Sequence, residues 1–428
     1  MYYATVPRWR PGIPSTLNTI DVGNGKLNRP LKPWPSCEMN KVGDAKAFQY
    51  VQSMEIDTQG RMWVIDVGRI NIADPSGNSS ASLAVPPKLV VMDIATQVVL
   101  QSTTLPTSMV PWHTNFMNDI VVDEIDMVAY ISDTRYNEAN DGAIHVYDYA
   151  TATIRTFTDS STHVELPGAG GPVFRYQNST TGNFSAYSSI QSPSDGIALT
   201  PDRTQLFYSA LSGLTLYSLP TSDLKNFNLG DAEWKTALGA KVTKHGKKPG
   251  PSDGMAFAAD GTLYFGDIIN ASLYKWHPAS STDVSTAALV VKNMTELVWI
   301  DTFAFDGNDN LLMTSNALWK YFAGNGYTPT EINFRVSRVP IGSNSYLSAQ
   351  CCKKSRKHTD VLGIVCGTIA AILCVAVAGF VLMRQRRARL AQEGQQEQAS
   401  AKGGDVEIPN PSADRGSGAR ATSHGDDL

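Results

Sequence analysis

The sequence lacks the motifs on which many enzyme classes depend. It contains no Gly-x-Ser-x-Gly motif, no His-Glu-x-x-His motif and no phosphate-binding glycine loop, so no standard catalytic constellation stands out. Its net charge of -4 leaves no basic surface of the kind that binds nucleic acid. Of its five cysteines, two lie inside an apolar segment near the carboxyl terminus and two are adjacent beside it. Too few remain for a disulfide framework or a zinc site.

The sequence does contain an internal repeat. Residues 194–210 and 252–267 each comprise a short strand that begins with Ser-Asp-Gly, a polar turn, and a second strand rich in aromatic and aliphatic residues. This is the pattern of a β-hairpin, and weaker copies lie at residues 54–66, 118–133 and 301–315. The separations between equivalent positions are about 64, 77, 58 and 48 residues. The positions taken as equivalent are Glu55, Asp119, Gly196, Gly254 and Thr302.

Such a repeat predicts an all-β fold, a β-propeller formed by residues 1–345. One sheet of this kind cannot bury both apolar faces alone, and a closed ring leaves no sheet uncovered. Residues 1–6 form a strand and not a signal peptide, because no charged start and apolar run precede them. The inner hairpin strand of the other repeats is missing here, so we expect an incomplete first blade. Residues 332–339 form the last strand, which is the natural partner for the missing piece.

The first strand of each repeat is expected to line a central channel, with its starting residue at the mouth. These residues are polar in all five repeats: Glu55, Asp119, Asp195, Asp253 and Thr302. Any single one of them is equally well explained as a turn or capping residue. A bias of the same kind at five equivalent positions favours a polar channel.

Residues 361–383 predict a single transmembrane helix, because they form an uncharged run about 23 residues long, or roughly 34 Å as a helix. A juxtamembrane linker at 346–360 precedes it, and a disordered cytoplasmic tail at 384–428, a possible partner-binding segment, follows. Basic residues flank both ends almost equally, so they do not orient the helix. Glycosylation sequons favour a cell-surface protein with the propeller outside. They lie at Asn78, Asn178, Asn183, Asn270 and Asn293.

The chain resembles the Yellow and major royal jelly protein family over about residues 4–340. The resemblance is carried by Val-Pro-Arg-Trp-Arg-Pro-Gly at 6–12, Gly-Arg-Met-Trp-Val-Ile-Asp at 60–66, the Ser-Asp-Gly hairpins and Trp-Ile-Asp-Thr-Phe-Ala at 299–304. It implies a six-bladed propeller, normally secreted, that binds small aromatic or biogenic amines at one end of its channel. By position, Thr302 and Asn316 correspond to polar residues of that amine site. Some Yellow proteins are reported to convert dopachrome.

Two departures from the family pattern bear on these implications. A cysteine usual before the Gly-Arg-x-Trp segment is replaced by Gln59, so we expect a family disulfide to be lost. Most members also lack a membrane anchor, so the resemblance does not predict a cell-surface role for this protein.

Three interpretations of the channel remain open. It binds a small aromatic amine through Thr302, Asn316, Asp195 and Asp253, or it acts as a dopachrome-type isomerase whose catalytic residues the sequence does not name. In the third, the protein is a calcium-dependent, lactonase-like hydrolase, and calcium is held as in the similar lactonase propellers, by Glu55, Asn118 or Asp119, Asp195 and Asp253. No other cofactor is expected. The histidines that a channel could use are His113 and His145, although such residues are more often ordinary loop and strand histidines.

Overall fold

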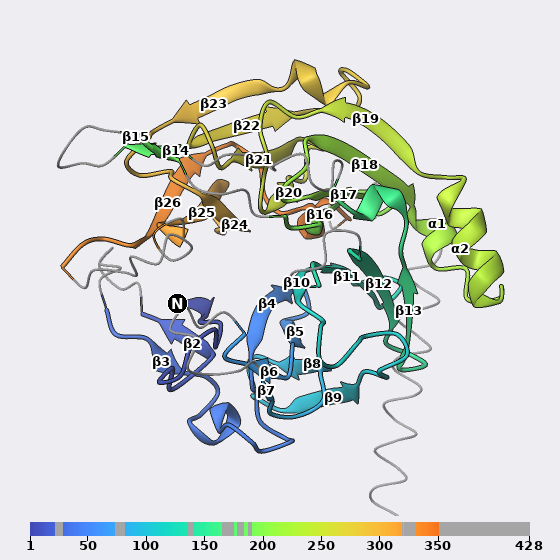
Figure 1. The fold of residues 1–428 in the computed structure, drawn as a ribbon, viewed down its shortest axis with the longest axis vertical. Coiled ribbons are helices and arrows are strands. Elements are labelled where there is room, and N and C mark those ends of the chain that lie inside the picture. The colour runs from blue at the N-terminus through green and yellow to red at the C-terminus, as the bar shows by residue number, and fades with distance from the viewer. Residues whose placement is uncertain are drawn as a thin grey trace, which may run out of the picture. The chain divides into compact units, whose positions relative to one another are not determined.

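The chain folds into successive antiparallel sheets arranged around a common axis (Figure 1). The computed structural model describes residues 1–21, 29–72, 82–135, 141–164, 175–177, 184–186, 191–318, 320 and 330–350. Within these residues, six sheets of three or four strands follow one another, and all belong to one unit, Met1–Lys354. The predicted all-β, six-bladed propeller is confirmed.

The first three blades are formed by the amino-terminal part of the chain. Blade 1 contains β1 (Tyr2–Thr5), β2 (Leu17–Ile20) and β3 (Lys32–Pro33). Blade 2 contains β4 (Val51–Ile56), β5 (Arg61–Asp66), β8 (Lys88–Asp93) and β9 (Val99–Thr104). Blade 3 contains β10 (Met117–Asp123), β11 (Val128–Asp133), β12 (Ala143–Asp148) and β13 (Thr153–Phe157). A small extra hairpin pairs β6 (Arg69–Ile70) with β7 (Ser82–Leu83).

The other three blades follow in the same order. Blade 4 contains β16 (Ser194–Leu199), β17 (Gln205–Ala210), β18 (Thr215–Pro220) and β19 (Thr243–Lys247). Blade 5 contains β20 (Met255–Phe257), β21 (Leu263–Asp267), β22 (Ser272–Trp276) and β23 (Ala288–Lys292). Blade 6 contains β24 (Ile300–Phe305), β25 (Asn310–Asn316) and β26 (Phe334–Pro340). A second small hairpin pairs β14 (Arg175–Gln177) with β15 (Phe184–Ala186).

Burial between neighbouring blades explains the composition of the strands. Every residue of β11 is buried, because both faces of a middle strand pack against another sheet. One hydrophobic cluster joins Trp63 and Leu89 of blade 2 to Val122 and Ile131 of blade 3. The outermost strand β9 is mostly exposed and correspondingly polar. The core is therefore distributed between the blades and leaves the channel to polar side chains.

The innermost strands of the blades lie side by side in chain order, from β4 through β10, β16 and β20 to β24. The expectation that blade 1 lacks its inner strand is wrong. Strand β1 takes that place: it pairs with β2 and lies beside β4, where the Thr5 hydroxyl donates a 3.0 Å hydrogen bond to the Gln52 carbonyl. Blade 1 nevertheless has only three strands in the described residues. The last strand, β26, pairs with β25, and no strand in the described residues pairs with its other edge.

Short helices interrupt the strands, which the sequence pattern did not indicate. Helices α1 (Thr221–Leu224) and α2 (Asp231–Gly239) lie between β18 and β19. On α2 only Trp234 and Leu238 are buried, so its apolar stripe is too narrow to stand out as a helical period. Four 3-10 turns complete the described elements: η2 (Glu38–Asn40), η3 (Ser160–Thr162), η4 (Val284–Thr286) and η5 (Tyr346–Gln350).

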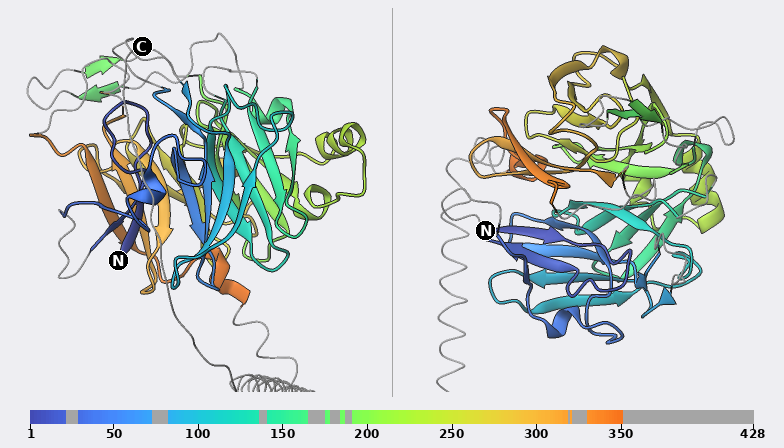
Figure 2. Two further views of the ribbon diagram at one scale, coloured as in Figure 1. Left: turned by 90° about the horizontal axis from the view of Figure 1, so that it is seen from below. Right: turned by 60° about the vertical axis from the view of Figure 1, so that its left-hand side comes forward.

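No helix in the part of the chain that the structure describes is long and apolar enough to cross a membrane. The predicted transmembrane segment at 361–383, the tail at 384–428 and the sequons at Asn78, Asn178 and Asn183 lie outside the described residues. The short η5 coil lies at one end of the propeller, opposite the β14–β15 hairpin (Figure 2).

Candidate functional site

The mouth of the channel is formed by an irregularity that recurs in the inner strands. In β4, β10, β16 and β24 the pairing register shifts, which leaves two residues of each strand outside the regular ladder. Bulges of this kind often redirect side chains next to functional sites. The two residues are Gln52-Ser53, Asn118-Asp119, Asp195-Gly196 and Asp301-Thr302. In blade 5, Asp253-Gly254 stands just before β20.

This register corrects the sequence alignment at one position. The residue of blade 2 that is equivalent to Asp119 is Ser53, because Met54 and Ile120 each resume the regular pairing. Glu55 therefore lies two residues further along its strand, roughly 7 Å deeper in the channel. Being two residues from Ser53, it faces the same side of the sheet. The predicted equivalence of Glu55 with the other mouth residues is wrong.

In blades 4 and 5, close packing of the inner strands requires glycine at the second of these two positions. A β-carbon on Gly196 would lie 2.2 Å from the carbonyl oxygen of Asp253, and one on Gly254 would lie 2.2 Å from that of Asp301. The Gly254 amide also donates a 2.8 Å hydrogen bond to the Asp301 carbonyl. The Asp-Gly pairs thus place a carboxylate at the mouth where two blades meet backbone to backbone.

Polar side chains form a continuous chain around part of the mouth. The Gln52 amide donates a 3.0 Å hydrogen bond to the Asn118 carbonyl oxygen, and Asn118 is in turn hydrogen-bonded to Asp195. Asp195 is hydrogen-bonded to Asp253, whose carboxylate also accepts a 2.6 Å bond from the Trp299 indole N–H. The structure thus brings together Asn118, Asp195 and Asp253, which the sequence analysis singled out.

Thr302 and Asn316 meet at a residue that the sequence analysis did not select. The Thr302 hydroxyl donates a 2.9 Å hydrogen bond to Asp301, and the Asn316 amide donates a 2.7 Å bond to the other oxygen of the same carboxylate. Asn316 ends β25, so it lies at the same end of the blade as the start of β24. Asp301 was detectable, because it aligns with Asp195 and Asp253 once the hairpins are superposed.

Burial raises the pKa values of the channel carboxylates. The pKa of Glu55 rises to about 8, first because of burial and then because Asp119 lies nearby. Burial raises the pKa of Asp119 to about 7, although its carboxylate accepts a 3.0 Å bond from the Ser53 hydroxyl. Burial likewise raises the pKa values of Asp195, Asp253 and Asp301. The hydrogen bond between two carboxyl groups requires that one of them keeps its proton.

These five carboxylates lack a cationic partner in the part of the chain that the structure describes. Within the described ranges, no ion pair includes Glu55, Asp119, Asp195, Asp253 or Asp301. Buried carboxylates in proteins are normally paired with a cation or bound to a metal. The channel is therefore poised to accept positive charge.

An apolar cluster lies beside the carboxylates at the mouth. Leu211, Ile268 and Trp299 are buried together, and each stands next to the mouth end of its blade's strands. Trp299 links the two groups, because its ring belongs to the cluster and its N–H bonds to Asp253. The site thus combines carboxyl groups with an apolar wall.

The residues of the calcium alternative do not lie at one level of the channel. Asn118, Asp195 and Asp253 are at the mouth, whereas Glu55 is two residues deeper and close to a tyrosine hydroxyl. Among the described residues, no group of three or more His, Cys, Asp or Glu side chains is placed to hold a metal ion.

The two histidines lie away from this site. His145 is fully buried on β12, the third strand of its blade, where it contacts Asp133 at 3.0 Å and Thr156 at 2.9 Å. His113 is exposed in a loop. Neither is on an inner strand.

Comparison with known proteins identifies the family. Residues 49–345 match the major royal jelly protein family over most of the propeller. The chain belongs to the major royal jelly protein family. Major royal jelly protein 6 of Apis mellifera is 23% identical over 82% of this chain and 77% of its own length. Protein yellow of Drosophila subobscura is 24% identical over 80% of this chain and 58% of its own length.

Solved structures show more distant likeness. A gluconolactonase from Xanthomonas campestris is 11% identical, with a TM-score of 0.37 over 63% of this chain and 69% of that chain. A luciferin-regenerating enzyme is 12% identical, with a TM-score of 0.32 over 70% of this chain and 94% of that chain. These scores are too low to carry an argument about activity. In this member of the major royal jelly protein family, Cys37 is an exposed free thiol.

Proposed function

We propose that the mouth of the channel binds a small organic cation, an aromatic or biogenic amine. The observation that carries this proposal is the group of five carboxylates without an ion-pair partner among the described residues. An ammonium group would supply the missing positive charge and favour the ionised forms that burial disfavours. Charge-assisted hydrogen bonds to such a group are about twice as strong as neutral ones.

The surrounding side chains suit an aromatic amine. Asp253 and Asp301 would face the ammonium group, while the apolar wall that includes Trp299 would cover the aromatic ring. Thr302 and Asn316 already donate hydrogen bonds to the Asp301 carboxylate, and these side chains would shift to accommodate an ammonium group bound to the same carboxylate. Membership of the family also favours an aromatic or biogenic amine as the ligand.

The test is calorimetry of serotonin, dopamine and tyramine with the purified full-length protein. Replacing Asn316 by alanine removes the bond that favours ionised Asp301, so Asn316→Ala is expected to weaken amine binding roughly tenfold, or about 1.4 kcal/mol. The matched control is Asn310→Ala on the same strand, since Asn310 bonds to Asp306 at 2.9 Å near the other end of β25. The control is expected to bind normally. Absence of heat with every amine would contradict the proposal.

Isomerase activity of the dopachrome type is a second candidate, favoured by the pKa of one carboxyl group. A general acid or base works best when its pKa lies near the working pH, and the pKa of Asp119 is raised to about 7. If the channel performs such chemistry, Asp119→Asn should lower the rate at least a hundredfold while amine binding persists. A spectrophotometric assay of dopachrome decay measures this rate. An unchanged rate in the variant would exclude Asp119 as the proton-transfer group.

We further propose that the protein is a single-pass cell-surface glycoprotein. Support comes from the uncharged run at 361–383 and from the sequons, of which Asn270 and Asn293 lie in turns of blade 5 near the surface. The protein is expected to fractionate with membranes and to run faster on a gel after glycosidase treatment. Asn270→Gln and Asn293→Gln should each remove one step of that mobility change. Recovery as an unglycosylated soluble protein would contradict this topology.

A further inference from the structure

The segment that follows the last blade lies at the base of the propeller, the end opposite the mouth. After β26 ends at Pro340, the chain returns to blade 5, where the Ala259 amide donates a 2.7 Å hydrogen bond to the Asn344 carbonyl. Tyr346 then enters the molecule and is only 4% exposed. Its ring belongs to the hydrophobic cluster shared by blades 3, 4 and 5. The segment is thus packed into the propeller and does not simply leave it.

The Tyr346 hydroxyl satisfies backbone groups that the propeller leaves unpaired. An inner strand pairs with its blade on one edge only, so the amides and carbonyls of its other edge face the channel. The Val122 amide donates a 2.9 Å hydrogen bond to the Tyr346 hydroxyl, which lies 3.2 Å from the Val122 carbonyl and 3.4 Å from Glu55. The single hydroxyl proton is shared between these two acceptors. Tyr346 therefore contacts both blade 2 and blade 3.

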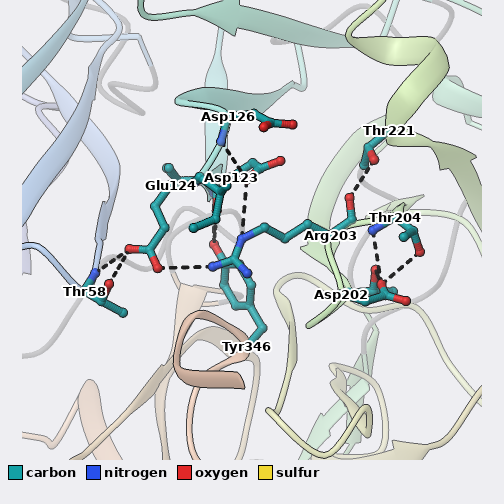
Figure 3. A network of polar contacts seen from close by, with 12 residues as sticks. Thr58, Asp123, Glu124, Asp126, Asp202, Arg203, Thr204, Thr221 and Tyr346 are labelled. Carbon is teal, nitrogen blue, oxygen red and sulfur yellow. Dashed lines mark hydrogen bonds and ion pairs between the residues drawn. The ribbon is translucent and has the colours of Figure 1, made fainter. Parts of the chain in front are cut away.

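Charged side chains connect three blades beside this tyrosine (Figure 3). Glu124, in the turn of blade 3, accepts 2.7 Å hydrogen bonds from the amide and the hydroxyl of Thr58 in the turn of blade 2. Arg203, in the turn of blade 4, donates a 3.2 Å bond to Glu124 and lies 3.4 Å from Asp123. Arg203 is 4% exposed, and its guanidinium group lies next to the Tyr346 side chain in Figure 3.

We propose that residues 342–347 form a built-in stopper, which closes the base of the channel and whose withdrawal opens the channel at that end. The stopper has two parts. Asn344 and Ser345 fasten it to blade 5, and the Tyr346 ring packs among blades 3, 4 and 5 while its hydroxyl reaches the inner strands of blades 2 and 3. This inference goes beyond the amine-binding proposal and holds whether or not an amine binds at the mouth.

The stopper makes the channel a pocket with one entrance. Glu55 is the deepest of the channel carboxylates and lies against Tyr346, so the same contact ends the polar lining of the channel. Tyr346 begins the 3-10 coil η5, so a displacement of this coil would act on Tyr346 directly.

The first test uses hydrogen exchange of the full-length protein. Tyr346→Phe keeps the ring but removes the hydroxyl group, so the Val122 amide loses its acceptor and is expected to exchange at least tenfold faster. The matched control is Tyr208→Phe, which removes the 2.7 Å contact with Ser161 from a buried tyrosine of blade 4. The control should leave exchange at Val122 unchanged. Equal exchange at Val122 in wild type and Tyr346→Phe would overturn the role of the hydroxyl group.

The second test measures access to the channel. A cysteine replaces Glu55, and its reaction with a small charged thiol reagent is followed by mass spectrometry of the peptide that contains it. Adding Tyr346→Ala should accelerate modification at residue 55 at least tenfold, whereas adding Tyr208→Ala, which disturbs the core elsewhere, should not. If both alanine variants have the same effect, Tyr346 stabilises the core without closing the channel, and the proposal fails.

Discussion

Replacing Glu55 by glutamine should make the protein more stable at neutral and alkaline pH. Glu55 is half-buried in the channel, where it lies 3.4 Å from the Tyr346 hydroxyl and accepts a 3.2 Å bond from the Ile56 amide. Its pKa is raised from 4.5 to about 8, mainly by burial and further by the charge of Asp119. Ionised Glu55 therefore destabilises the ligand-free protein. Glutamine has a similar shape and cannot ionise.

The magnitude follows from the difference in bound protons. Between pH 4.5 and about 8 the folded protein keeps a proton on Glu55 that the unfolded chain has lost. The free energy of unfolding then falls as the pH rises, by about 1.4 kcal/mol for each pH unit. From pH 6 to pH 8 this amounts to between about 2 and 3 kcal/mol as an upper bound, because water reaches the half-buried group and weakens the effect. The contribution is lost in Glu55→Gln.

The measurement is urea-induced unfolding at pH 6, 7 and 8 without added amine. Wild type is expected to lose stability more steeply than Glu55→Gln over this range, and the variant should be the more stable of the two at pH 8. An exposed glutamate on α2 provides the control, Glu233→Gln, which should follow wild type. The same pH dependence in wild type and Glu55→Gln would refute the reasoning. So would a variant that is less stable than wild type at pH 8.

Two further predictions concern packing and buried charge. Gly254→Ala should lower the free energy of unfolding by about 1 to 3 kcal/mol, because its β-carbon would lie 2.2 Å from the Asp301 carbonyl oxygen. The control Gly307→Ala has open space around the new methyl group and should leave stability unchanged when the two variants are compared by thermal denaturation. Lys88→Met should cost about 3 to 5 kcal/mol, because Lys88 is buried 3.0 Å from the Asp66 carboxylate, which would lose its cation. Adding Asp66→Asn should recover part of this loss in chemical denaturation, and no recovery would contradict the ion-pair explanation.

The sequence by itself determined the fold and the chemical character of the channel. The repeated hairpins predicted the blades because each hairpin pairs two strands of different composition. The first begins with polar residues that face the channel, and the second is rich in aromatic and aliphatic residues that are buried on both sides. Asp195 and Asp253 were identified because each precedes a glycine at the same place in the repeat. The physical reason for the glycine, the close approach of the next inner strand, is a contact between blades, but it recurs in two successive blades and therefore leaves a repeated pattern in the sequence.

Only the tertiary structure decided the depth of each residue and the partners it has. The sequence placed Glu55 at the mouth, but a shift in pairing register puts it two residues deeper. The shift cannot be recognised from the sequence, because the residues before Glu55 include the polar Gln52 and Ser53, which fit the mouth equally well. Asp301 gains its importance from Asn316, fifteen residues away along the chain. Tyr346 reaches Val122 across 224 residues. A contact between segments so far apart depends on how the blades close around the channel, which no local pattern records.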